Sequence, residues 1–119
     1  MITGLDLNET IDYKVDSDKD NPTIWKLGVL SSYLYSRITA ESEPLEGSFK
    51  VLQIAIKGWD NFALNGGLFP YKTEKQKVIG REMEVVPLSD LERIPMKVLT
   101  ELYNQILIIN NLKEDERKN

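Results

Sequence analysis

The 119-residue sequence contains no cysteine and no histidine. Without cysteine there is no thiol nucleophile, no redox pair and no thiolate ligand for zinc or an iron–sulfur cluster. Without histidine there is no imidazole base, no histidine-containing catalytic triad and no imidazole metal site. Only carboxylates, lysine, tyrosine and hydroxyls remain for chemistry. The composition therefore argues against an enzyme, and we expect no cofactor and no bound metal.

Long apolar runs are also missing. No stretch approaches the roughly 20 residues that cross a bilayer, and no basic segment followed by an apolar one opens the chain. We therefore expect a soluble protein without a membrane partner, working in the compartment where it is made. With 41% apolar and 29% charged residues, the composition is that of a globular domain long enough for a sizeable core.

Basic residues are fewer than acidic ones. The chain has 15 Lys and Arg against 19 Asp and Glu, and residues 1–25 alone carry the whole net charge of −4. A nucleic-acid-binding protein has the opposite sign, gathered in a basic stripe. The densest basic stretch, residues 72–81, also contains Glu74. We interpret it as the solvated face of a hairpin and expect no nucleic-acid partner.

Two alternating segments near the N-terminus predict an antiparallel hairpin. In residues 10–16 and 23–29 apolar and polar side chains alternate, a period of two that is typical of half-buried strands. The polar residues 17–22 between them read as a loop, and Pro22 sits where its missing N–H removes no ladder hydrogen bond. The apolar side chains expected on one face are Ile11, Tyr13, Val15, Trp25, Leu27 and Val29.

Apolar residues at three- and four-residue intervals predict a central amphipathic helix over residues 48–64. Gly58 would weaken this helix by about 1 kcal/mol relative to alanine. Asn65-Gly66-Gly67 would end it, because these residues accept a left-handed cap. The apolar stripe consists of Phe49, Leu52, Ala55 or Ile56, Trp59 and Phe62.

Three further segments have regular patterns. A short helix is expected over residues 33–38, and a strongly amphipathic C-terminal helix over residues 95–111. Between them, residues 70–87 predict a second hairpin with a tight turn at Gly80-Arg81.

Together these segments predict a single α+β domain over residues 1–112. In chain order it comprises an N-terminal antiparallel β-hairpin, a central amphipathic helix, a short second hairpin and a C-terminal helix. The strands and helices do not alternate as in βαβ units, so a parallel sheet is disfavoured. Residues 113–119 form a charged tail that is expected to fray.

The acidic segment of residues 16–20 has charges spaced as at the start of a calcium-binding loop. Such a loop also needs a glycine at its sixth position and a bidentate glutamate at its twelfth. Here those positions hold Asn21 and Leu27, so we interpret the segment as an acidic hairpin loop. Carboxylate pairs such as Glu82 and Glu84 fall on the solvent face of a strand, where no catalytic pKa shift develops.

Four apolar side chains are candidates for binding a protein partner: Trp59, Phe62, Leu107 and Ile108. Trp59 falls on the stripe of the central helix, so it either belongs to the core or docks a partner, since tryptophan is enriched in interface hot spots. Residues 106–109 are four consecutive large aliphatics, which cannot share one stripe of a helix with 3.6 residues per turn. That helix is either packed on two sides within the domain or presents a patch for self-association or partner docking.

Several stretches also carry a family resemblance. They are D-S-D-K-D-N-P-T-I-W-K-L-G-V-L-S-S near the start, I-K-G-W-D-N-F followed by N-G-G, R-I-P-M-K-V-L-T-E-L, and N-N-L-K-E-D-E-R-K-N at the end. With them the chain resembles small proteins from the virion-structure cassettes of tailed bacteriophages, and among these it is most similar to tail assembly chaperones. The likeness rests on Trp25, Lys26, Leu27, Gly58, Trp59, Asn61, Phe62, Ile94, Pro95, Glu101, Leu102 and Asn111.

The resemblance implies a non-enzymatic morphogenesis protein that acts in the cytoplasm of the infected bacterial host. A tail assembly chaperone binds the tape measure protein, an extended helical chain rich in apolar residues, and keeps it soluble while tail tube subunits are recruited. Two other functions stay open, a structural neck or tail-completion component of the virion and a small phage protein that binds a host defence factor. An assembly factor should be absent from finished particles, which separates the first function from the second.

Overall fold

A computed structural model describes residues 1–112 of the chain and confirms an α+β fold with an N-terminal hairpin, further short hairpins and a C-terminal helix. The tail expected at residues 113–119 lies outside the described residues. The elements in chain order are β1 (Thr10–Tyr13), β2 (Ile24–Gly28), α1 (Ser32–Glu41), α2 (Pro44–Ala55), β3 (Ile56–Asp60), β4 (Ala63–Leu64), β5 (Gly67–Leu68), β6 (Glu74–Val78), β7 (Arg81–Val85), α3 (Leu88–Leu91) and α4 (Met96–Ile109).

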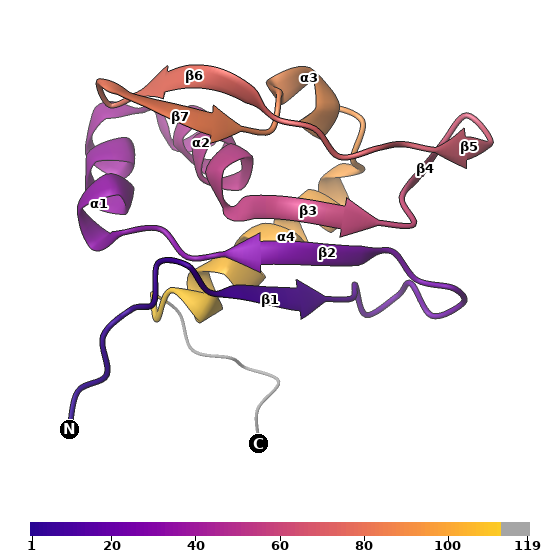
Figure 1. The fold of residues 1–119 in the computed structure, drawn as a ribbon, viewed down its shortest axis with the longest axis horizontal. Coiled ribbons are helices and arrows are strands. Elements are labelled where there is room, and N and C mark those ends of the chain that lie inside the picture. Colours follow the sequence, from indigo (N-terminus) through magenta and orange to yellow (C-terminus); the bar gives the residue numbers. More distant parts are fainter. Residues whose placement is uncertain (113–119) are drawn as a thin grey trace.

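Figure 1 shows how these elements are layered. The sheet of β1, β2 and β3 lies in front of α4, with α1 and α2 beside its end and the hairpin β6–β7 above it. The small hairpin β4–β5 projects from the opposite end. None of the helices in residues 1–112 is long and apolar enough to cross a bilayer.

The N-terminal hairpin predicted from alternation is confirmed. β1 pairs antiparallel with β2 from Thr10 opposite Gly28 to Tyr13 opposite Trp25, and β3 pairs antiparallel with the other edge of β2. Because side chains alternate between the two faces of a strand, one face of the sheet is apolar and packs into the core. The buried side chains on that face are Tyr13, Trp25, Leu27, Ile56 and Trp59.

The prediction of one helix over residues 48–64 is wrong beyond Ala55. The chain there leaves α2 and continues as β3, in which Trp59 lies directly opposite Trp25 of β2. The helical spacing of apolar residues is a local signal, whereas the Trp25–Trp59 pair joins segments far apart in sequence. Burial of both rings on one sheet face outweighs the local preference.

Both short hairpins turn through two residues with positive φ. These are Asn65 and Gly66 (53° and 82°) between β4 and β5, and Ile79 and Gly80 (52° and 75°) between β6 and β7. Two successive residues with positive φ are typical of a type I′ turn, whose twist matches that of the two paired strands. Asn65-Gly66 is therefore a hairpin turn where a helix cap was expected. The second hairpin is confirmed, but its turn lies one residue before the expected Gly80-Arg81.

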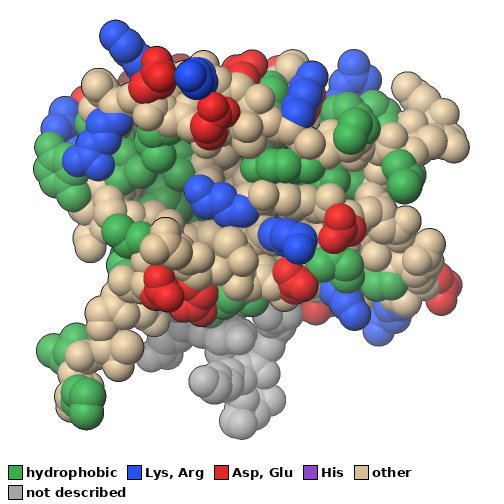
Figure 2. Space-filling view, viewed as in Figure 1, with side chains coloured by type: hydrophobic (Ala, Val, Ile, Leu, Met, Phe, Trp, Pro, Cys, Tyr) green, Lys and Arg blue, Asp and Glu red, His purple; other side chains and the backbone are tan. Residues whose placement is uncertain are grey.

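A bulge in β3 shapes the outer face of the sheet. The pairing shifts between Lys26 and Leu27, which leaves Lys57 as an extra residue in β3. The aliphatic part of Lys57 lies over Gly28, where an added Cβ would come within 2.8 Å of the lysine Cε. Partial desolvation of the side chain lowers the pKa of Lys57, because it disfavours the charged ammonium. Figure 2 shows that charged side chains of both signs are interspersed over this face.

Two polar side chains, Glu101 within α4 and Asn110 at its C-terminal end, tie this helix to the sheet and its loops. Glu101 accepts hydrogen bonds from the Tyr13 hydroxyl (2.5 Å) and from the Asp16 backbone N–H (3.0 Å). Asn110, which is buried, accepts a hydrogen bond from the Leu30 N–H (2.9 Å) and donates one to the Ile106 carbonyl (2.7 Å). The loop after β1 and the segment after β2 are therefore both held against the same helix.

We expect Asn110→Ala to lower the free energy of unfolding by about 1–3 kcal/mol, because it leaves the buried Leu30 N–H without a partner. Urea denaturation followed by tryptophan fluorescence measures the change. Thr100→Ala, at an exposed position of the same helix, is the matched control and should change stability by less than about 0.5 kcal/mol. Equal unfolding midpoints for Asn110→Ala and the parent chain would show that the hydrogen bond between Leu30 and Asn110 does not stabilise the fold.

Candidate protein-binding site

An open, largely apolar groove of about 440 Å³ lies where α2, β6 and α3 meet. Its floor and rim are formed by aliphatic, aromatic and amide side chains with three charged groups among them. The lining residues are Leu45, Glu46, Phe49, Lys50, Gln53, Gln76, Leu88 and Glu92.

The two most exposed apolar side chains of the groove each follow a proline. Leu45 comes directly after Pro44 in the first turn of α2, and Leu88 comes directly after Pro87 at the start of α3. Proline suits a helix start because its missing N–H would have no intrahelical partner there. Leu45 is 66% exposed and Leu88 is 45% exposed, so neither side chain is fully buried in the monomer. Phe49, one turn further along α2, is half-buried and packs on the core.

One buried amide fixes the hairpin wall of the groove against α2. Gln53 Nε2 donates hydrogen bonds to the Val86 carbonyl (2.8 Å) and to Gln76 Oε1 (3.2 Å). The Gln53 carbonyl in turn accepts a hydrogen bond from the Val86 N–H (3.0 Å). These three bonds hold the β6–β7 hairpin in place over α2, so the groove is formed before any partner binds.

The charges around the groove differ in sign. Glu46 and Glu92 bring negative charge to its lining, and Lys50 brings positive charge. Lys50 Nζ donates a hydrogen bond to Ser42 Oγ (3.1 Å), which turns the ammonium toward the end of α1. Within residues 1–112, no three carboxylate, histidine or cysteine side chains gather closely enough to hold a metal ion. The apolar part of the lining, formed by Leu45, Phe49 and Leu88, suits an apolar side chain as ligand.

The structure places the predicted partner-binding residues Trp59 and Phe62 in an aromatic cluster, not on a helix. Trp59 lies in β3, is 5% exposed, and donates its indole N–H to the Phe69 carbonyl (2.7 Å). Its ring packs on Trp25, with centroids 5.8 Å apart, and on the half-buried Phe62 at 5.4 Å. Trp59 thus occupies a core position, which is the first of the two interpretations that its sequence pattern allowed. Contact of Phe62 with a partner stays a prediction.

The other two predicted residues, Leu107 and Ile108, lie near the C-terminal end of α4. Ile106 is buried in the core and Ile109 packs against it, as one helical stripe requires. Leu107 and Ile108 are half-buried, and the core cluster of the described residues includes neither of them. Their contact with a partner remains a prediction, at a surface separate from the groove.

Sequence reasoning did not single out Leu45 or Leu88 as site residues. They are separated by more than forty residues in the chain, and only the packing of the β6–β7 hairpin on α2 brings them to one groove. The signal available in the sequence was a leucine placed directly after a helix-starting proline, which occurs at both positions.

Comparison of the chain with protein-family models, curated proteins and solved structures found no match. The class that fold and site define is therefore an α+β protein with a preformed apolar groove open to solvent.

Tyr71 belongs to the same aromatic cluster, with its ring centroid 5.0 Å from that of Trp59, and it makes the stability of the fold depend on pH. Burial raises the pKa of Tyr71 to about 12, and its hydroxyl donates a 2.6 Å hydrogen bond to the Ile56 carbonyl. A tyrosine in the unfolded chain has a pKa of about 10. The stabilisation from protonated Tyr71 is therefore complete below about pH 10 and is lost as the pH rises through about 12.

An ultraviolet titration of tyrosinate absorbance measures this effect. We expect a late ionisation near pH 12 that Tyr71→Phe removes. Tyr33→Phe, at an exposed position, is the control and should leave that late ionisation in place. If the late ionisation persists in Tyr71→Phe, another tyrosine is responsible for it.

Proposed function

We propose that this chain is a non-enzymatic bacteriophage morphogenesis protein, a tail assembly chaperone that binds the tape measure protein in the cytoplasm of the infected host. In this function the groove between α2, β6 and α3 receives apolar side chains from one face of a client helix. The resemblance of the sequence to phage tail assembly chaperones supports the biological setting, and the groove supports the mode of binding.

The observation that carries the proposal is the pair of exposed leucines on an apolar floor. Small-molecule sites usually enclose most of the ligand surface, whereas this groove is open and has Leu45 and Leu88 on its rim. Grooves of that kind bind the apolar face of an amphipathic helix through residues spaced three, four and seven apart. A helical client with repeated apolar side chains, such as a tape measure protein, presents this spacing many times along its length.

The rigidity of the groove also supports a binding function. Gln53 joins α2 to the hairpin through both its side chain and its backbone carbonyl, so the wall is fixed in the free protein. A preformed site avoids the entropy cost of ordering loops when the partner binds. A chaperone that must capture an aggregation-prone client before the client associates with itself gains from this preorganisation.

The central test is Leu45→Glu, assayed by co-expression with the tape measure protein encoded by the same phage. Burial of a leucine contributes about 1.5–3 kcal/mol, so we expect the substitution to weaken binding at least about tenfold and to leave the client insoluble. Because Leu45 is 66% exposed, the variant should remain folded.

Leu68→Glu is the matched control, since Leu68 is 71% exposed in β5 at the far end of the molecule. It should bind and solubilise the client as the parent chain does. Equal loss of binding in both variants would indicate a nonspecific effect of added charge and would contradict the groove.

A third variant, Ile108→Glu, separates the groove from the C-terminal end of α4. If the predicted surface at Leu107 and Ile108 binds a partner or a second copy, Ile108→Glu should abolish that association while the monomer stays folded. Analytical ultracentrifugation measures self-association, and co-purification measures client binding. Loss of client binding in Ile108→Glu, with full binding in Leu45→Glu, would place the client on α4 and overturn the proposed use of the groove.

A further inference from the structure

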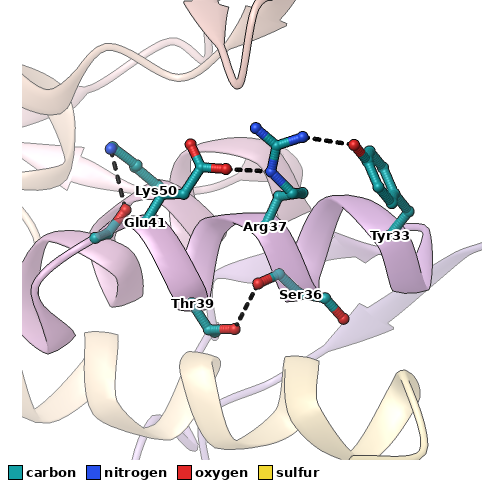
Figure 3. Close-up of polar contacts among 7 residues, drawn as sticks. Tyr33, Ser36, Arg37, Thr39, Glu41 and Lys50 are labelled. Carbon is teal, nitrogen blue, oxygen red and sulfur yellow. Dashed lines mark hydrogen bonds and ion pairs between the residues drawn. The ribbon is translucent and has the colours of Figure 1, made fainter.

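A continuous row of polar side chains runs along α1 on the side that meets the β6–β7 hairpin. Arg37 Nη1 donates a 2.5 Å hydrogen bond to the Tyr33 hydroxyl, and its Nε forms an ion pair with Glu41, so three residues at intervals of four are linked. Figure 3 shows these three side chains lined up along one face of the helix, followed by Lys50 of α2. Tyr33 is 55% exposed, which leaves its ring available at the surface.

A second arginine reaches the same tyrosine from a different element. The guanidinium carbon of Arg81, the first residue of β7, lies 5.5 Å from the centroid of the Tyr33 ring, and that of Arg37 lies 5.6 Å from it. At these distances both guanidinium groups are attracted by the ring. Arg37 has Glu41 as a counter-ion, but Arg81 forms no ion pair with a carboxylate of residues 1–112. The row therefore carries positive charge that the described residues do not neutralise.

The row is connected to the groove through Lys50. Lys50 lines the groove and is hydrogen-bonded to Ser42 at the end of α1, beside Glu41. The pKa of Glu41 is lowered first by its hydrogen bond from Arg37 and then by the charges of Arg37 and Lys50. Arg81, Arg37 and Lys50 thus give the row three positive charges against the single negative charge of Glu41. The lining of the groove itself has charges of both signs, because Glu46 and Glu92 accompany Lys50 there.

We propose that this row, Tyr33, Arg37, Glu41, Lys50 and Arg81, is a charged rim that selects and orients the partner helix. The occupant is an amphipathic helix whose apolar face enters the groove and whose flank toward α1 carries Asp or Glu. This inference rests on the proposed use of the groove and adds the charge pattern of the partner. Tyrosine and arginine are among the residues enriched at interface hot spots, and an apolar centre with a polar rim is the usual anatomy of an interface.

The positive charge of the row gives the partner helix a preferred flank. An acidic flank over α1 meets Arg37 and Arg81, and this attraction is lost when the helix is turned so that the flank faces away from α1. A partner with basic residues on the flank toward α1 would face uncompensated like charge. Charge complementarity of this kind contributes more to the choice of partner than to the total affinity.

The experiment uses two synthetic helical peptides with the same leucine stripe, one with glutamates on the flank beside the stripe and one with lysines there. Fluorescence anisotropy at low salt measures both dissociation constants for the full-length protein. We expect the acidic-flank peptide to bind roughly fivefold more tightly, the upper range for an exposed ion pair. Arg81→Glu should abolish or invert this preference, because it replaces the unpaired positive charge with a negative one.

Lys14→Glu is the control, because it makes the same change of net charge at an exposed position after β1, which is an edge strand of the three-stranded sheet and not part of the β6–β7 hairpin. It should keep the preference for the acidic-flank peptide. If the parent chain binds both peptides equally, or Arg81→Glu leaves the preference unchanged, the rim assignment is wrong while the groove stands. If neither peptide binds, both the groove and the rim are overturned.

Discussion

The cross-strand contact between Trp25 and Trp59 is the interaction on which most of this architecture depends. The two residues lie opposite each other in β2 and β3, with ring centroids 5.8 Å apart in an edge-to-face arrangement. Such aromatic pairs contribute about 0.5–1.5 kcal/mol beyond the burial of their surface. The pair requires residue 59 to be in a strand, and α2 must therefore end only a few residues earlier.

The course of the chain beyond β3 follows from the same cluster. Phe69 accepts the Trp59 indole N–H on its carbonyl, and the Tyr71 hydroxyl reaches back to the Ile56 carbonyl. These contacts hold residues 69–71 alongside β3, and the chain then enters the β6–β7 hairpin next to α2. Gln53 completes the connection through its bonds to Gln76 and Val86. The wall of the groove is thus set by an aromatic cluster that itself does not line the groove.

How much could be predicted from the sequence depends on the range of the contacts involved. The N-terminal hairpin follows from strict alternation, and the C-terminal helix from a stripe of period 3.6, and both are confirmed. The stripe over residues 48–64 satisfied the same local rule, yet residues 56–60 form a strand because Trp25, more than thirty residues away, is the partner of Trp59. Asn65-Gly66-Gly67 was predicted to end a helix with a left-handed cap. Asn65 and Gly66 do have positive φ, but they join two strands, because the segment before them is not helical.

The groove was less predictable than the fold. A leucine after a helix-starting proline marks Leu45 and Leu88, but Met96 follows Pro95 in the same way, is 61% exposed, and lies outside the groove. The pattern therefore identifies apolar side chains that a first helical turn leaves exposed, and it does not show which of them come together. That information comes only from the hairpin packing that Gln53 and the aromatic cluster impose.

The exposure of these leucines has an energetic meaning in a domain of this size. Leaving one leucine in water forgoes about 1.5–3 kcal/mol, which is a substantial fraction of the roughly 5–15 kcal/mol that stabilises a typical domain. The same chain buries Leu27, Ile38 and Leu102 completely, so its packing is not poor in general. Exposed apolar side chains also occur elsewhere, as at Leu68 and Met96, but Leu45 and Leu88 come together in one groove. In the proposed function a second molecule covers these leucines, and the charged row along α1 selects the flank of that molecule that approaches.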